Sequence, residues 1–151
     1  MTNDIISTLN SLITTSKDSE QGFRSSADKV KDQNLKDIFL SKAERCKGYV
    51  VELQEYVSKL NAKPEGSGSV AGALHRGFLE VKYMLTGEDD YAILVECERG
   101  EGVARDNYLA ALKEDLPTEV LAIVQKQYNQ VAEDYATISN LKEKYEINKT
   151  L

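Results

Sequence analysis

Two pairs of amphipathic stretches, joined by one long connection, constrain the fold of this chain most. Apolar side chains recur at helical spacing through residues 4–30 and then to about residue 60, and again from 90 to 112 and from 117 to 147. The turns within each pair, near 32–34 and 115–117, are short, so each pair predicts an antiparallel hairpin. The connection over 61–89 is far longer than antiparallel neighbours need. One long crossover between two hairpins is typical of ferritin-like bundles.

We therefore predict an all-α, ferritin-like four-helix bundle that forms a single domain over residues 1–151. It consists of a hairpin over 4–60, a crossover over 61–89 and a second hairpin over 90–147. Asp32 or Asn34 is placed to cap the second helix, and Pro117 suits the first position of the fourth.

The crossover is expected to contain an additional helix. A loop rich in Pro, Gly and Ser over 61–69 is followed by an amphipathic pattern over 69–86. A helix of that length spans about 27 Å, enough to return the chain along the bundle. Its apolar face would pack on the bundle through Leu74, Phe78, Val81 and Leu85. His75, the only histidine, is interpreted as a hydrogen-bonded residue that fixes this helix, with a metal-ligand role as the alternative.

Each expected bundle helix has a stripe of core positions that is mainly apolar but includes polar side chains. The stripes are Ile5, Leu9, Leu12, Ile13, Ser16, Glu20, Phe23, Ala27 and Val30; Leu35, Phe39, Lys42, Cys46, Tyr49, Leu53, Tyr56 and Leu60; Leu94, Cys97, Glu101, Ala104, Tyr108 and Ala111; and Val120, Val124, Gln127, Val131, Tyr135, Ile138, Leu141 and Tyr145.

A short motif occurs in the first helix of both hairpins. SEQGFR (19–24) and ERGEGVAR (98–105) each contain a glutamate, a following glycine and an arginine four residues after the glutamate. Glycine inside a helix costs about 1 kcal/mol relative to alanine. We therefore expect Gly22, Gly100 and Gly102 to permit a close approach of neighbouring groups.

Counting residues along the helices predicts where these glutamates meet. Glu20 lies 12 residues before Asp32, and Glu101 lies 11 residues after Asp90, so both reach mid-bundle if the first turn and the third helix start at one end. A buried carboxylate must be paired. The sequence thus predicts a buried polar cluster in which arginines neutralise the two glutamates: Glu20, Arg24, Arg45, Glu101, Arg105 and Asp134.

The alternative interpretation makes Glu20 and Glu101 metal ligands, with iron or manganese as the cofactor. Ferritin-like dimetal sites take one Glu from each of two helices and a Glu-x-x-His pair from each of the other two. Here the residue three positions after Glu44 is a lysine, and the one after Glu133 is an alanine. The missing histidines favour arginine pairing and no cofactor.

Composition excludes several classes of function. A net charge of −6 disfavours nucleic acid and anionic membrane surfaces as partners. No apolar run approaches the roughly 20 residues that span a bilayer, and MTNDIIS lacks the pattern of a secretory signal. Cys46 and Cys97 have no metal-ligand spacing, which is typical of buried thiols in a reducing compartment. We expect a cytoplasmic protein.

Four phrases resemble a bacterial family of ferritin-like four-helix-bundle domains of unknown function: SKDSEQGFR (16–24), GSGSVAGALHRGF (66–78), LTGEDDYAIL (85–94) and ERGEGVA (98–104). The resemblance covers nearly the whole chain. It implies a ferritin-like bundle in a bacterial cytoplasm and supplies no reaction.

Together these observations predict a non-enzymatic, stress-related or structural protein that forms homo-oligomers. The alternative function is a carboxylate-rich metal-binding oxidase or storage protein.

Overall fold

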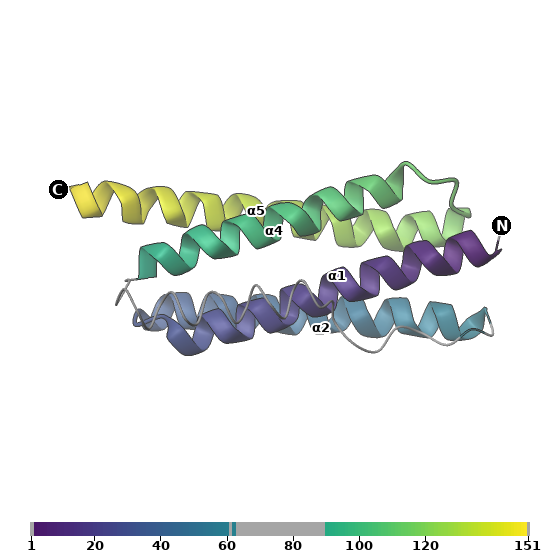
Figure 1. Ribbon diagram of the computed structural model, residues 1–151, viewed down its shortest axis with the longest axis horizontal. Coiled ribbons are helices and arrows are strands. Elements are labelled where there is room, and N and C mark those ends of the chain that lie inside the picture. Colours follow the sequence, from purple (N-terminus) through teal and green to yellow (C-terminus); the bar gives the residue numbers. More distant parts are fainter. Residues whose placement is uncertain (1, 61, 63–89, 151) are drawn as a thin grey trace.

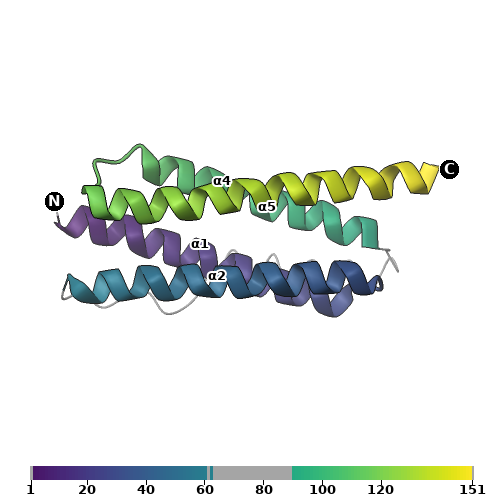
Figure 2. The same ribbon diagram turned by 180° about the vertical axis from the view of Figure 1, so that it is seen from behind.

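The computed structural model describes residues 2–60, 62 and 90–150, and these residues form four helices and no strand. Helices α1 (Thr2–Lys29) and α2 (Gln33–Lys59) make the first hairpin, and α4 (Asp90–Leu112) and α5 (Thr118–Thr150) make the second. The two hairpins lie side by side with their long axes roughly aligned (Figures 1 and 2). The predicted all-α, ferritin-like bundle is confirmed. The expected crossover helix over 69–86, with His75, lies outside the described residues.

The directions of the helices require a long crossover. Figure 1 shows the α1–α2 turn and the start of α4 at one end of the bundle, with the N-terminus and the end of α2 at the other. Helix α4 therefore runs parallel to α2, and the end of α2 and the start of α4 lie at opposite ends of the bundle. Helix α5 continues to Thr150, slightly past the predicted end at 147.

One carboxylate fixes the second hairpin to the turn of the first. Both oxygens of Asp90 accept hydrogen bonds from backbone N–H groups, from Lys31 at 2.8 Å and from Asp32 at 2.9 Å. The side chain of Asp32 in turn caps α2, as predicted, and also accepts a 2.7 Å hydrogen bond from the hydroxyl of Tyr145 near the end of α5. These contacts bring all four helices together at one end, which is the alignment that the residue count assumed.

The hydrophobic core has two parts, one toward each end of the bundle. Burying a large aliphatic or aromatic side chain contributes about 1.5–3 kcal/mol, so both parts stabilise the contact between the hairpins. In the second part the rings of Phe23 and Phe39 stack with their centroids 6.1 Å apart. The first part contains Leu9, Leu12, Ile13, Val50, Leu53, Val57, Ala104, Tyr108, Ala111, Val120, Val124 and Val131, and the second Phe23, Ala27, Val30, Leu35, Phe39, Ala43, Cys46, Ile93, Leu94, Cys97 and Ile138.

Three predicted core tyrosines, Tyr49, Tyr56 and Tyr135, are only half-buried, and the next or preceding residue is buried instead. These buried neighbours are Val50, Val57 and Asp134, of which Asp134 was expected in the buried polar cluster. A tyrosine hydroxyl needs a polar partner, and the side chains of Tyr56 and Tyr135 reach polar groups near the surface. Tyr56 donates to Glu119 at 3.4 Å, and the guanidinium of Arg105 lies 4.3 Å from the centroid of the Tyr135 ring.

None of the four described helices is both long enough and apolar enough to cross a membrane.

Candidate functional site

A layer of buried polar side chains crosses the bundle between the two parts of the core. Its most buried members are Lys42 of α2, Glu101 of α4 and Asp134 of α5, and Ser19 of α1 donates a hydrogen bond to Glu101. Apolar residues flank the layer along the chain; in α4, for example, Cys97 and Ala104 lie on either side of Glu101. The polar residues of the core stripes therefore lie at the same level along the axis of the bundle.

Asp134 is the centre of this layer. One of its oxygens, Oδ1, accepts from Lys42 Nζ at 2.7 Å, from Arg45 Nη2 at 2.5 Å and from Gln130 Nε2 at 3.3 Å. The side chains of Lys42 and Asp134 are each 4% exposed. Because a buried charge must be paired and hydrogen-bonded, Lys42 and Arg45 together make the burial of Asp134 tolerable and connect α2 to α5.

Glu101 is buried without an ion pair to a described residue. It is 3% exposed, its Oε1 accepts a 3.4 Å hydrogen bond from Ser19, and its Oε2 has no hydrogen-bond partner among the described residues. Burial, reinforced by the charge of Asp134, raises the pKa of Glu101 to about 8, although Lys42, Ser19 and Arg45 act in the opposite direction. Glu101 therefore holds its proton at neutral pH. A neutral carboxyl group avoids repulsion with the neighbouring carboxylate of Asp134.

The structure divides the six residues of the predicted polar cluster into three groups. Arg45, Glu101 and Asp134 lie in or against the layer. Glu20 and Arg24 form an ion pair of 3.0 Å at its edge, where Arg24 also binds Glu44 at 2.9 Å. Arg105 binds its neighbour Asp106 at 3.2 Å and covers the ring of Tyr135.

As expected, an arginine pairs with Glu20, but none of the described arginines pairs with Glu101. Among the described arginines, Arg45 reaches the layer, but its guanidinium binds Asp134. Ser19, the residue before Glu20, bonds to Glu101 and so places the two copies of the motif at one level, as the residue count predicted. Lys42 and Arg45 both bind Asp134, and burial raises the pKa of Glu101 so that a proton neutralises this side chain.

Sequence reasoning missed the role of Lys42. This lysine appeared on the predicted core stripe of the second helix, and a charged residue in such a position signals a buried partner. Its partner was not identifiable, because the residue that faces it, Asp134, is 92 positions away in the chain.

A second set of hydrogen bonds crosses all four helices next to this layer. The hydroxyl of Tyr108 donates to Gln127 Oε1 at 2.7 Å, and Ser16 bonds to the same hydroxyl at 2.8 Å. Gln127 Nε2 donates to Glu52 at 2.8 Å. Satisfied buried networks of this kind favour one arrangement of the helices over alternatives, so this set fixes how the hairpins pack.

Neither cysteine is suited to nucleophilic chemistry. Cys46 and Cys97 are both buried and free. Burial raises the pKa of Cys46 well above its ordinary value and that of Cys97 to about 12. The thiolate is the reactive form, so both residues act as core side chains.

The side chains present do not fit a carboxylate-bridged dimetal centre. Such centres require ionised carboxylates and histidines from the bundle helices. Here Glu101 keeps its proton, Asp134 binds two cations of the protein and Glu20 binds Arg24. Within residues 2–60, 62 and 90–150, no group of three or more His, Cys, Asp and Glu side chains is arranged to hold a metal ion.

Comparison with solved structures shows that the fold is ferritin-like. The chain is similar to part of a two-domain protein from Anabaena variabilis that contains DJ-1/ThiJ/PfpI-like and ferritin-like domains, with a TM-score of 0.77 and 14% sequence identity. The match covers 96% of this chain and 37% of that protein, so this chain spans little more than a third of its length. Among curated proteins, none matches the sequence. A family described as a domain of unknown function (DUF2383) matches residues 4–114, and the chain belongs to this family.

Proposed function

We propose that this chain is a non-enzymatic, structural or stress-related protein that self-associates and uses cations of its own in place of a metal centre. The observation that supports this most is the contact of 2.7 Å between Lys42 Nζ and Asp134 Oδ1 in the buried layer. A lysine ammonium and an arginine guanidinium bind Asp134 in this layer, whereas a ferritin-like dimetal site needs carboxylates that are open to the metal.

The internal cations oppose metal binding energetically. A metal ion that used Asp134 would displace Lys42, whose side chain is 4% exposed. Leaving such an ammonium buried without its partner costs about 3–5 kcal/mol. The metal would also need the proton of Glu101 to leave, because the ligand form of a carboxyl group is the ionised one.

The same layer lacks the accessibility that catalysis requires. The pKa of Glu101 is about 8, but at 3% exposure this group cannot exchange a proton with a bound substrate unless the helices separate. The two free, protonated thiols support a reducing compartment, and we place the protein in the cytoplasm.

Metal binding is the second candidate function. It is favoured by one observation: within the described part of the chain Oε2 of Glu101 has no hydrogen-bond partner, and the nearby charge of Asp134 raises the pKa of Glu101. On this alternative, Glu101 and Glu20 would bind iron or manganese in an oxidase or storage protein, after rearrangement of Lys42.

Thermal melting distinguishes the two functions. We expect the melting temperatures of the wild-type protein and of Glu101→Gln to be unchanged by Fe(II), Mn(II) or Zn(II). A large metal-dependent increase in the wild type that is lost in Glu101→Gln would overturn the proposal in favour of metal binding. Sedimentation at micromolar concentration tests self-association separately, and a single 16.8 kDa species would refute it.

A further inference from the structure

The outer face of α2 carries charged and apolar residues in a self-complementary order. Spacings of three or four residues place them on one side of the helix. Along the chain the order is basic, apolar, acidic, and then basic, apolar, acidic again. We call this the α2 stripe, and its members are Lys36, Leu40, Glu44, Lys47, Val51 and Glu55.

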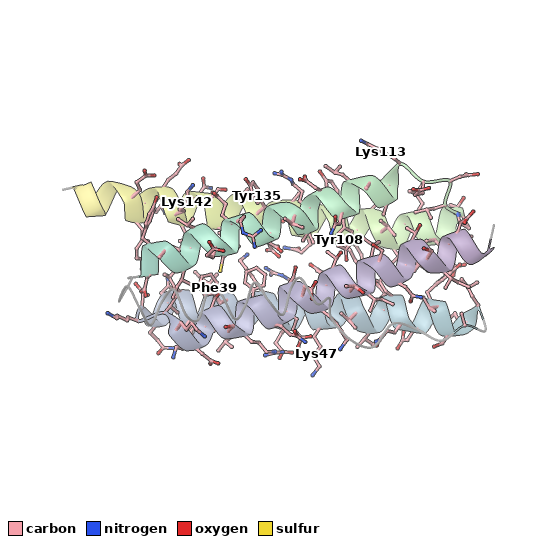
Figure 3. All side chains as sticks on the ribbon, viewed as in Figure 1. Phe39, Lys47, Tyr108, Lys113, Tyr135 and Lys142 are labelled. Carbon is pink, nitrogen blue, oxygen red and sulfur yellow. The ribbon has the colours of Figure 1, made fainter. Side chains whose placement is uncertain are left out.

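The α2 stripe is accessible to a partner. Leu40 and Val51 are 40% and 45% exposed, which makes them two of the four large hydrophobic residues that are exposed in the described part of the chain. Glu44, Lys47 and Glu55 are exposed, and Figure 3 shows Lys47 pointing outward from the bundle. Next to Val51, an open groove is lined by Val51, Gln54, Glu55, Ser58 and Lys59.

A second α2 helix, placed antiparallel about a two-fold axis between Glu44 and Lys47, matches the stripe at every position. Glu44 then faces Lys47 of the second copy at the centre. Leu40 faces Val51 on either side of it, which brings Leu40 to the groove. Lys36 faces Glu55 at the ends. Each pair occurs twice, as an isologous interface requires. A parallel arrangement would instead place each charge against its own copy.

Charges within one chain do not compete strongly for the stripe. Glu44 binds Arg24 at 2.9 Å on the side toward α1, and the side chain of Arg24 is 37% exposed. Lys47 helps to lower the pKa of Glu44 in its own helix by charge attraction, and such an i, i+3 attraction between two exposed side chains is weak. The opposite charge of a second copy would therefore compete only with weak, solvent-exposed attractions at these positions.

We propose that this chain forms a two-fold symmetric homodimer in which the α2 stripes of two copies pack antiparallel. The proposal rests on the self-association proposed above and assigns it to a surface. From residue 36 to residue 55 the stripe is about 29 Å long. One pair of helices of that length belongs to the lower end of specific interface sizes, so dimerisation should depend on protein concentration in the micromolar range.

Complementary charge reversal tests this interface. An acidic variant carries Lys36→Glu and Lys47→Glu, and a basic variant carries Glu44→Lys and Glu55→Lys. Each variant alone should dimerise on the order of 100-fold more weakly than the wild type, because like charges face each other at four positions. An equimolar mixture should recover a dimer, because every charge then faces its opposite. Val103→Lys, which changes an exposed apolar residue of α4, is the matched control and should dimerise normally.

Sedimentation equilibrium of the four proteins and of the mixture separates the outcomes, with thermal melting to verify that each variant is folded. If both charge variants dimerise as the wild type does, or if the mixture remains monomeric, the α2 stripe is not the interface, although self-association stands. A wild-type protein that is monomeric at every concentration tested would overturn both proposals.

Discussion

Lys42 Nζ lies 2.7 Å from Asp134 Oδ1, and both side chains are 4% exposed, so an ion pair between two helices of different hairpins occupies the middle of the core. The contact connects α2 to α5, and on the proposed function it carries the positive charge that a metal ion supplies in ferritin-like dimetal proteins. It separates the two hydrophobic parts of the core. The stability of the protein should therefore depend on this ion pair and, through the neighbouring Glu101, on pH.

Removing one member of this pair should be strongly destabilising. In Lys42→Met the carboxylate of Asp134 retains Arg45 but loses its most buried partner, and we expect the free energy of unfolding to fall by about 3–5 kcal/mol. Urea denaturation gives this value. Lys126→Met is the matched control, because Lys126 forms an exposed ion pair with Glu52, and such pairs contribute at most about 1 kcal/mol.

The double variant Lys42→Met/Asp134→Leu separates the cost of an unpaired charge from the value of the pair. Replacing a buried ion pair by apolar groups is often neutral, and the partly exposed Arg45 is free to turn toward water. We expect the double variant to be more stable than Lys42→Met. A double variant whose loss equals the sum of the two single losses would show that the pair is not coupled.

The stability of the protein should fall as pH rises from about 5 to about 8. The pKa of Glu101 is about 8 in the folded protein and near its ordinary value of 4.5 after unfolding. Between these values the folded state binds a proton that the unfolded state has released, so stability decreases with pH, by at most about 1.4 kcal/mol per unit. Below pH 4.5 both states are protonated, and the effect disappears.

Glu101→Gln isolates this contribution, because glutamine resembles the protonated acid and does not titrate. The variant should become more stable relative to the wild type as pH increases from 5 to 8. Urea unfolding of both proteins across this range measures the difference. A difference that is constant with pH would show that Glu101 is ionised in the folded protein.

Substitution of the motif glycines by alanine should change the stability of the protein differently at Gly100 and at Gly102. A Cβ atom at Gly100 would have open space, so Gly100→Ala should stabilise the helix by up to about 1 kcal/mol. At Gly102 a Cβ atom would lie 3.3 Å from the ring of Tyr135, and displacement of the ring offsets the same gain. Thermal melting of the two variants tests this contrast, and equal stabilisation would contradict it.

Asp90 should be essential for the junction of the two hairpins. Asp90→Ala leaves the N–H groups of Lys31 and Asp32 without acceptors, at a cost of about 1–3 kcal/mol for each group that stays buried. Amide hydrogen exchange should accelerate selectively at residues 31 and 32. Asp37→Ala, which changes an exposed carboxylate of α2, serves as the control, and unchanged exchange in Asp90→Ala would refute the role of this contact.

Much of this architecture follows from the sequence because it depends on local rules. Helical periodicity defines the four helices, and the length of the 61–89 connection selects the crossover arrangement. Residue counting then places Glu20 and Glu101 at one level because every residue of a helix advances by the same distance. The motif glycines fit their expected role only at Gly102, since Gly22 and Gly100 face open space.

The charge state of the site does not follow from the sequence, because it depends on which long side chains reach which carboxylate. Counting put Arg45 at the right depth but could not show that its guanidinium binds Asp134 and leaves Glu101 alone. The sequence placed both Asp134 and Tyr135 of α5 toward the core, and only Asp134 is buried, because periodicity cannot resolve a rotation of one residue. Three-dimensional contacts decide both points.

The most direct test of the central claim is the metal content of the protein after purification without chelators and incubation with excess Fe(II) or Mn(II), followed by desalting. If Lys42 and Arg45 supply the positive charge of the core, elemental analysis should find far less than one metal ion per chain, and Glu101→Gln should give the same value as the wild type. One or more ions per chain in the wild type, lost in Glu101→Gln, would contradict the account.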